Sequence, residues 1–215
     1  MHIRSIALTA FVWLVAADVS AQICLGRPSF SEGPYQASAA LSFTDGAQGF
    51  GGGAAIGSEE VFAGASLTWT NLSDIDGSVT SFAAGAGASF AVSQSERIEA
   101  CPVASVIISS GPDIDPADVS GVGLRAGGRL GLVAVESGNM EVVPTFGLDI
   151  AYDRVRASVG DVETTARETY LIARAGVGFL LNRRIGIVPE LGIPLGLDGS
   201  DPVFTILFSY TFGTR

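Results

Sequence analysis

The amino-acid sequence predicts an all-β fold, a single antiparallel up-and-down barrel of about ten strands. Ten segments alternate apolar residues with small or polar ones, the period of two that a strand imposes. No segment after residue 21 shows the 3.6-residue apolar period of a helix. Three pairs of aromatic residues also stand eight positions apart on one face of a segment: Tyr35 and Phe43, Phe82 and Phe90, Phe204 and Phe212.

The last segment, 203–212, has the clearest alternation. Its aromatic residues share one face, while Thr205, Ser209 and Thr211 share the other. The other predicted strands follow the same rule with fewer aromatic residues, and eight strands is the alternative count. The predicted segments are 35–43, 49–56, 61–70, 78–92, 98–109, 119–135, 140–152, 167–181, 184–193 and 203–212.

Residues 1–21 are predicted to be a signal peptide and not part of the fold. Arg4 provides a basic start, residues 6–17 are apolar, and Val19-Ser20-Ala21 is a small-residue cleavage site. The apolar run is too short for a transmembrane helix, which needs about 20 residues. We therefore expect an exported chain with an N-terminal segment at 22–33 and the barrel at 34–215.

Composition indicates that the barrel crosses a membrane. Mean hydropathy is +0.43 and only 16% of residues are charged, which is apolar for an exported soluble protein. In a membrane barrel the apolar residues are spread over alternate positions that face lipid. Eight residues of tilted strand span roughly 20 Å of height, close to the apolar band between aromatic girdles. The net charge of −10 and the absence of Lys argue against a nucleic-acid partner.

The predicted connections alternate in length. Short turns are expected at 57–60, 93–97, 136–139 and 182–183, and longer, Asp-rich loops at 44–48, 72–77, 111–118, 153–166 and 194–202. The carboxylates of these loops could gather on Ca²⁺, although Asp and Gly are also ordinary turn residues. The carboxylates concerned are those of Asp74, Asp76, Asp113, Asp115, Asp118, Asp198 and Asp201.

Between Tyr35 and Phe212 this pattern, with the signal peptide and the aromatic last strand, resembles small bacterial outer-membrane β-barrels of the OmpA/OmpX-like kind. The resemblance implies an outer-membrane location, periplasmic short turns, extracellular loops, and contact with membrane lipid and the barrel-assembly machinery. It also implies that the last strand carries the assembly signal, here Phe204, Phe208, Tyr210 and Phe212. Such families usually end on the aromatic residue, whereas three residues follow Phe212 here.

Two cysteines follow the predicted cleavage site, and this topology places both towards the periplasmic end. Cys24 precedes the first strand, and Cys101 follows the turn between the fourth and fifth. The periplasm is oxidising, so we predict a Cys24–Cys101 disulfide that ties the N-terminal segment against the barrel rim. Two free thiols are the alternative.

Charged residues are predicted to fill the lumen. Arg125, Arg129, Asp149, Arg174 and Glu190 lie on the non-apolar face of neighbouring strands, where they can pair into a plug. A gated path for small solutes is the alternative interpretation.

The only His is His2, within the predicted signal peptide, so His-dependent catalysis and His-containing zinc sites are excluded from the mature chain. We therefore predict a non-enzymatic outer-membrane protein with a structural or surface-interaction role and no cofactor. The rivals are a small-solute pore and an exported soluble lipocalin-like barrel. A lipocalin-like barrel would turn the apolar face inward, around an apolar ligand, and the charges outward.

Overall fold

The computed structural model describes residues 23–73, 77–92, 97–112, 117–159, 162–197 and 199–214. The predicted signal peptide and the loop residues Asp74, Asp76, Asp113, Asp115 and Asp198 lie outside these ranges. The described elements are the 3-10 helices η1 (Ile23–Leu25) and η2 (Phe30–Glu32) and the strands β1 (Tyr35–Thr44), β2 (Ala47–Gly57), β3 (Val61–Leu72), β4 (Gly77–Ala88), β5 (Phe90–Ala91), β6 (Ile98–Ser110), β7 (Ala117–Leu132), β8 (Val135–Ser137), β9 (Met140–Val159), β10 (Val162–Leu181), β11 (Ile185–Leu195) and β12 (Val203–Phe212).

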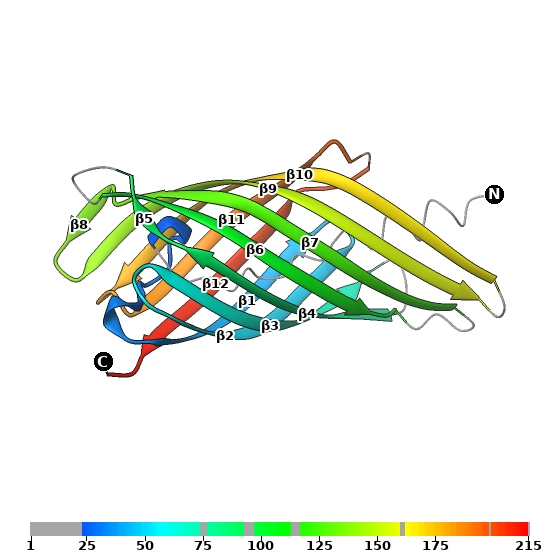
Figure 1. Cartoon of the computed structure of the whole chain (residues 1–215), viewed down its shortest axis with the longest axis horizontal. Helices are drawn as coiled ribbons and strands as arrows, with labels where there is room; N and C mark the ends of the chain where they lie inside the picture. Colours follow the sequence, from blue (N-terminus) through cyan, green and yellow to red (C-terminus); the bar gives the residue numbers. More distant parts are fainter. Residues whose placement is uncertain are drawn as a thin grey trace.

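Ten of these strands close into a cylinder (Figure 1). Neighbours in the chain pair antiparallel all the way round, and β12 pairs with β1 to close the sheet. The two short strands add nothing to the circumference, because β5 continues the path of β4 against β6 and β8 forms a small hairpin with β9. The prediction of an all-β, up-and-down barrel of about ten strands is confirmed.

The apolar face of each strand points outward and the small or polar face points inward. In β12, Phe204, Phe208, Tyr210 and Phe212 are exposed, whereas Thr205, Ser209 and Thr211 are buried. A soluble barrel would not leave so continuous an apolar surface in water. The lipocalin-like alternative is therefore wrong, and the outer surface is that of a barrel surrounded by lipid. None of the helices in the described ranges has the length and apolar character needed to cross a membrane.

Aromatic residues mark both edges of the outer apolar belt. Tyr35 is the cross-strand partner of Phe212, and eight residues along, Phe43 is the partner of Phe204. Near Phe43, the rings of Phe50 and Trp69 stack with their centroids 5.4 Å apart. The eight-residue spacing in the sequence thus places one aromatic side chain at each edge.

Two of the predicted long loops are wrong. Residues 44–48 form a tight turn in which only Asp45 and Gly46 lie between the strands, with Gly46 at φ +73°. Such a left-handed conformation suits glycine, which has no Cβ. Residues 153–166 belong almost entirely to β9 and β10, which continue to Val159 and Val162. Their polar side chains have the composition of a loop, although the alternation of a strand continues through them. Figure 1 shows β7, β9 and β10 extending beyond the rest of the barrel.

Candidate functional site

The lumen of the barrel has two ends and two unlike walls. We call the end that holds η1, η2 and Phe212 the terminal end, and the end with the β9–β10 tip the hairpin end (Figure 1). The central charged side chains come from β7, β9, β10 and β11. The remaining wall carries small hydroxyl side chains, among them the buried Ser66, Thr68, Thr70, Ser81, Ser109, Thr205, Ser209 and Thr211.

The N-terminal segment enters the barrel at the terminal end. We call residues 24–30 the plug. Phe30 has no exposed surface and packs in one apolar cluster with Leu25, Ala55 and Phe62. The sequence predicted that this segment lies against the rim, and that is wrong in one respect: the segment occupies the mouth itself. The reason is its composition, because buried apolar side chains gain more inside the mouth than on a wet rim.

Close backbone approach lets the plug fit. A Cβ on Gly26 would lie 2.9 Å from the Cα of Gly178 in β10, so only glycine allows this contact. On the facing wall, a Cβ on Gly57 would lie 2.6 Å from the Phe30 ring. The amide Nε2 of Gln36 donates to the Pro28 carbonyl at 3.3 Å, which adds a polar tie from β1 to the plug.

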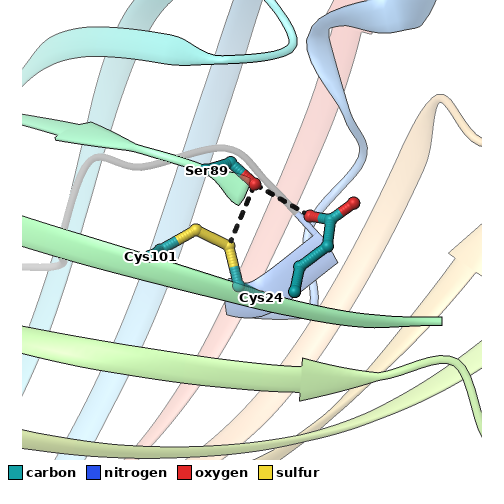
Figure 2. Close-up of a disulfide and its surroundings, with 4 residues drawn as sticks. Cys24, Ser89 and Cys101 are labelled. Atoms are coloured by element: carbon teal, nitrogen blue, oxygen red, sulfur yellow. Dashed lines mark hydrogen bonds between the residues drawn. A yellow bond between two sulfur atoms is a disulfide. The ribbon is translucent and has the colours of Figure 1, made fainter. Parts of the chain in front are cut away.

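A disulfide joins the plug to the barrel wall. The bond links Cys24 in η1 with Cys101 in β6, which are 77 residues apart in sequence (Figure 2). The Ser89 hydroxyl lies 3.8 Å from the Cys24 sulfur and donates to a carboxylate oxygen of Glu99 at 2.9 Å. Both cysteines are buried, so the bond lies inside the terminal mouth and not on the outer surface.

Four predicted lumen residues form a chain of ion pairs that we call the central network. One carboxylate oxygen of Asp149 accepts from Arg129 at 3.0 Å and from Arg174 at 2.8 Å. Arg174 also donates to Glu190 at 2.9 Å. Asp149 is 2% exposed and Arg129 is 3% exposed, so the core of the network lies away from water. Two arginines and two carboxylates therefore balance in charge across β7, β9, β10 and β11.

The fifth predicted residue, Arg125, belongs to a separate cluster closer to the hairpin end. Its guanidinium binds both carboxylate oxygens of Asp153, at 2.8 and 2.9 Å, and lies 3.1 Å from the Tyr170 hydroxyl. Tyr170 in turn donates to Asp153 at 2.7 Å. Asp153 and Tyr170 were not among the predicted lumen residues. A signal for both existed, since each stands four residues from a predicted lumen residue and so shares its face.

Glycines beside these clusters provide the space for the long side chains. A Cβ on Gly123 would lie 2.6 Å from a carboxylate oxygen of Asp153. A Cβ on Gly127 would overlap the carboxylate of Asp149, and one on Gly147 would overlap the side chain of Arg129. These glycines alternate with arginine along the lumen face of β7 and face it from β9, so small and large residues interlock across the lumen.

A further group of ion pairs lies at the terminal end, outside the membrane-facing part of the strands. Arg183, in the turn after β10, donates to Glu141 at 2.6 Å and to Glu136 at 3.3 Å. The hydrogen bond with Glu141 and its negative charge raise the pKa of the Arg183 guanidinium. Within the described ranges, no three His, Cys, Asp or Glu side chains gather as a metal site would require.

Comparison with known proteins rests on structure alone. No family model and no curated protein matches the sequence. The β domain of the Bordetella autotransporter BrkA has a similar structure, with a TM-score of 0.57 and 13% identity over 83% of this chain and all of that one. The translocator domain of NalP from Neisseria meningitidis gives 0.45 and 14%, over 83% and 88% of the chains. The N-terminal barrel of Pseudomonas aeruginosa OprF gives 0.38 and 12%, over 83% and 96%.

The similarity to the autotransporter domain shows the fold, and the apolar outer belt indicates that lipid surrounds it. Both agree with the expectation drawn from the sequence. The chain is a β-barrel with the fold of bacterial outer-membrane barrels and an apolar outer surface suited to lipid.

Proposed function

We propose that this protein is a non-enzymatic outer-membrane barrel with a surface-interaction role. The part that acts is a three-stranded extension, which we call the ribbon: residues 117–119 of β7, 153–159 of β9 and 162–170 of β10. The single observation that carries the proposal is the unpaired edge of β10 within this ribbon.

The edge is long and regular. β10 pairs with β11 only from Leu171 onward, while its first nine residues pair with β9 alone among the described strands. Nine residues of strand correspond to about 30 Å. An exposed edge presents backbone N–H and C=O groups to which another extended segment can pair. The partner class that fits this surface is therefore an extended polypeptide segment.

The side chains of the ribbon suit such a partner. On its inner face, Val155, Ala157 and Val159 alternate with the polar outer residues of β9. An added strand would continue both faces, with apolar side chains inward and polar ones outward. Glu163, Arg167 and Glu168 put charges along the edge, and such charges suppress pairing with unselected strands.

The filled lumen supports this proposal over a small-solute pore. The plug occupies one mouth, and the central network joins four strands across the middle. An aqueous channel is expected at about 16 strands and not at ten. With its interior occupied by side chains, the barrel serves as a membrane anchor for the ribbon.

Site-specific photo-cross-linking in intact cells tests the proposal. A photoreactive amino acid replaces Thr164 or Thr165, both exposed on the free-edge strand, or Ala175 as a control on the lipid-facing wall. The expected result is a discrete protein adduct from the two edge positions and none from Ala175. Adducts absent from both edge positions, in bacteria grown alone and with host cells or other surfaces, would contradict the proposal.

A shortened ribbon provides the matched variant. Val155 and Ala166 are cross-strand partners, so replacing residues 156–165 by Asn-Gly joins them through a two-residue turn without changing the register. The expected variant reaches the outer membrane, melts like the wild type and no longer binds the cross-linked partner. Retained binding would place the interaction elsewhere on the surface.

A further inference from the structure

Two arginines lie directly opposite each other on the outer face of the ribbon. Arg154 in β9 is the cross-strand partner of Arg167 in β10, and both are exposed. Like charges in this position repel and destabilise a sheet. Neither arginine makes an ion pair within the described chain. Arg156, two residues further along β9, differs because Glu163 neutralises it. Among the described residues, the Arg154–Arg167 pair is thus a concentrated positive charge without a counter-ion.

The pair lies immediately beyond the edge of the apolar belt. Successive outward rows across β9 and β10 are Ile150 with Leu171, Tyr152 with Thr169, and Arg154 with Arg167. The polarity of the surface therefore changes from aliphatic to hydroxyl to cationic over two steps of the sheet. Membrane proteins show this order at the level of the lipid headgroups, where Tyr and Arg keep polar tips in water above an apolar base.

The neighbouring strand continues the apolar belt beside the pair. Arg154 is also the partner of Val122 in β7, and Val122 is an exposed apolar residue of the belt. The arginine is therefore flanked by lipid-facing surface on one side and by a second arginine on the other. In a chain of net charge −10, such a pair at headgroup depth attracts anions selectively to this position.

We propose that Arg154 and Arg167 bind the phosphate of an anionic lipid in the leaflet at the hairpin end. Guanidinium groups bind phosphate through two parallel hydrogen bonds, and two of them can hold one phosphate from both sides. The hydroxyls of Thr169 and Tyr152, one row closer to the belt, are further donors to the same group. The acyl chains of the lipid lie on Ile150 and Leu171 below. This continuity with the belt assigns the phosphate to a lipid and not to the aqueous phase.

Lipid binding to the purified folded barrel tests the proposal. The barrel in a non-ionic detergent is titrated with phosphatidic acid, and bound lipid is counted by native mass spectrometry. Arg154→Gln and Arg167→Gln are each expected to weaken binding about tenfold, the loss that accompanies removal of a charge-assisted hydrogen bond. Arg156→Gln is the matched control, because it removes an arginine from the same face whose charge Glu163 already neutralises. Its affinity is expected to stay within about twofold of the wild type.

Further arms separate the sources of phosphate. Diacylglycerol, which lacks the phosphate, is expected to bind no better to the wild type than to a variant that carries both Arg154→Gln and Arg167→Gln. Millimolar inorganic phosphate is expected to leave bound phosphatidic acid in place. The shortened ribbon retains both arginines and is expected to bind lipid normally, which separates this site from the proposed protein interaction. Equal binding by all variants, or full displacement by inorganic phosphate, would overturn the proposal.

Discussion

Tyr35 and Phe212 are cross-strand partners on the outer face of the seam where the first and last strands meet, and their ring centroids lie 5.9 Å apart. Tyr210 stacks beside them, with its centroid 6.0 Å from that of Phe212. The seam is therefore bordered by aromatic contacts at the terminal end. β12 both completes the cylinder and presents an aromatic face on its outer surface.

We predict that the last strand is required for assembly. Replacing Phe208, Tyr210 and Phe212 together by Ser removes three lipid-facing aromatic residues at the seam, and the variant should be degraded before it reaches the outer membrane. Membrane fractionation and immunoblotting measure the outcome. The control replaces Phe146, Leu148 and Ile150 in β9 by Ser, which removes similar outward apolar surface away from the seam. Equal loss of both variants would show that lipid contact, and not the strand's position, decides the result.

Asp149→Ala should strongly destabilise the barrel. It leaves Arg129 and Arg174 buried without their shared carboxylate, and orphaning one partner of a buried pair costs about 3–5 kcal/mol. The readout is the temperature at which the folded gel band converts to the unfolded one. Arg174→Ala should rescue the Asp149→Ala variant only in part, because Arg129 remains, and a double-mutant cycle measures their coupling. Glu163→Ala, which breaks an exposed pair, is the control and should change little.

Tyr170→Phe should lower the free energy of unfolding by about 1–3 kcal/mol. The hydroxyl donates to Asp153 and accepts from Arg125, so its removal leaves both buried groups short of one partner. The same gel-shift melting assay applies. Tyr35→Phe, which alters an exposed tyrosine at the seam, serves as the control. If the two substitutions lowered the free energy of unfolding equally, the hydrogen bonds of the buried Tyr170 hydroxyl would add no stability beyond that of an exposed tyrosine hydroxyl.

Replacing Cys24 and Cys101 by Ser should loosen the plug and leave the cylinder closed. The bond spans 77 residues, and loss of a native disulfide typically costs about 2–5 kcal/mol. Phe30 is fully buried in the intact protein, so chymotrypsin should cut after it only in the variant. Ser89→Ala, which keeps both cysteines, is the control. Two alkylatable thiols in protein taken from the native envelope would contradict the disulfide itself.

The strands and their faces could be predicted because lipid outside and a narrow lumen inside impose a strict period of two. The prediction therefore placed Arg129, Asp149, Arg174 and Glu190 on the lumen side, where the structure brings them together. It failed for Asp153, because the polar residues that follow it have the composition of a loop, although Asp153 stands four residues after Asp149 and so shares its face.

The position of the plug could not be predicted for a different reason. Residues 24–30 have no periodicity, and their environment depends on gaps left by Gly57 and Gly178 far away in the sequence. Similarly, the alignment of Arg154 with Arg167 follows from the register of β9 against β10, and both residues lie in or directly border the stretch 153–166, whose polar composition predicts a loop.

Closure of the sheet also bears on when the plug can be placed. The plug belongs to the first residues of the described chain, yet the strand that completes the cylinder around it is the last one made. Cys101 lies in β6, halfway along, so the cysteine pair can form while the sheet is still an open, curling trough. Once β12 pairs with β1, residues 24–30 can reach the lumen only through the terminal end of the barrel. Oxidation of Cys24 and Cys101 in the periplasm, before the sheet closes, would thus hold the N-terminal segment in position while the remaining strands are added around it.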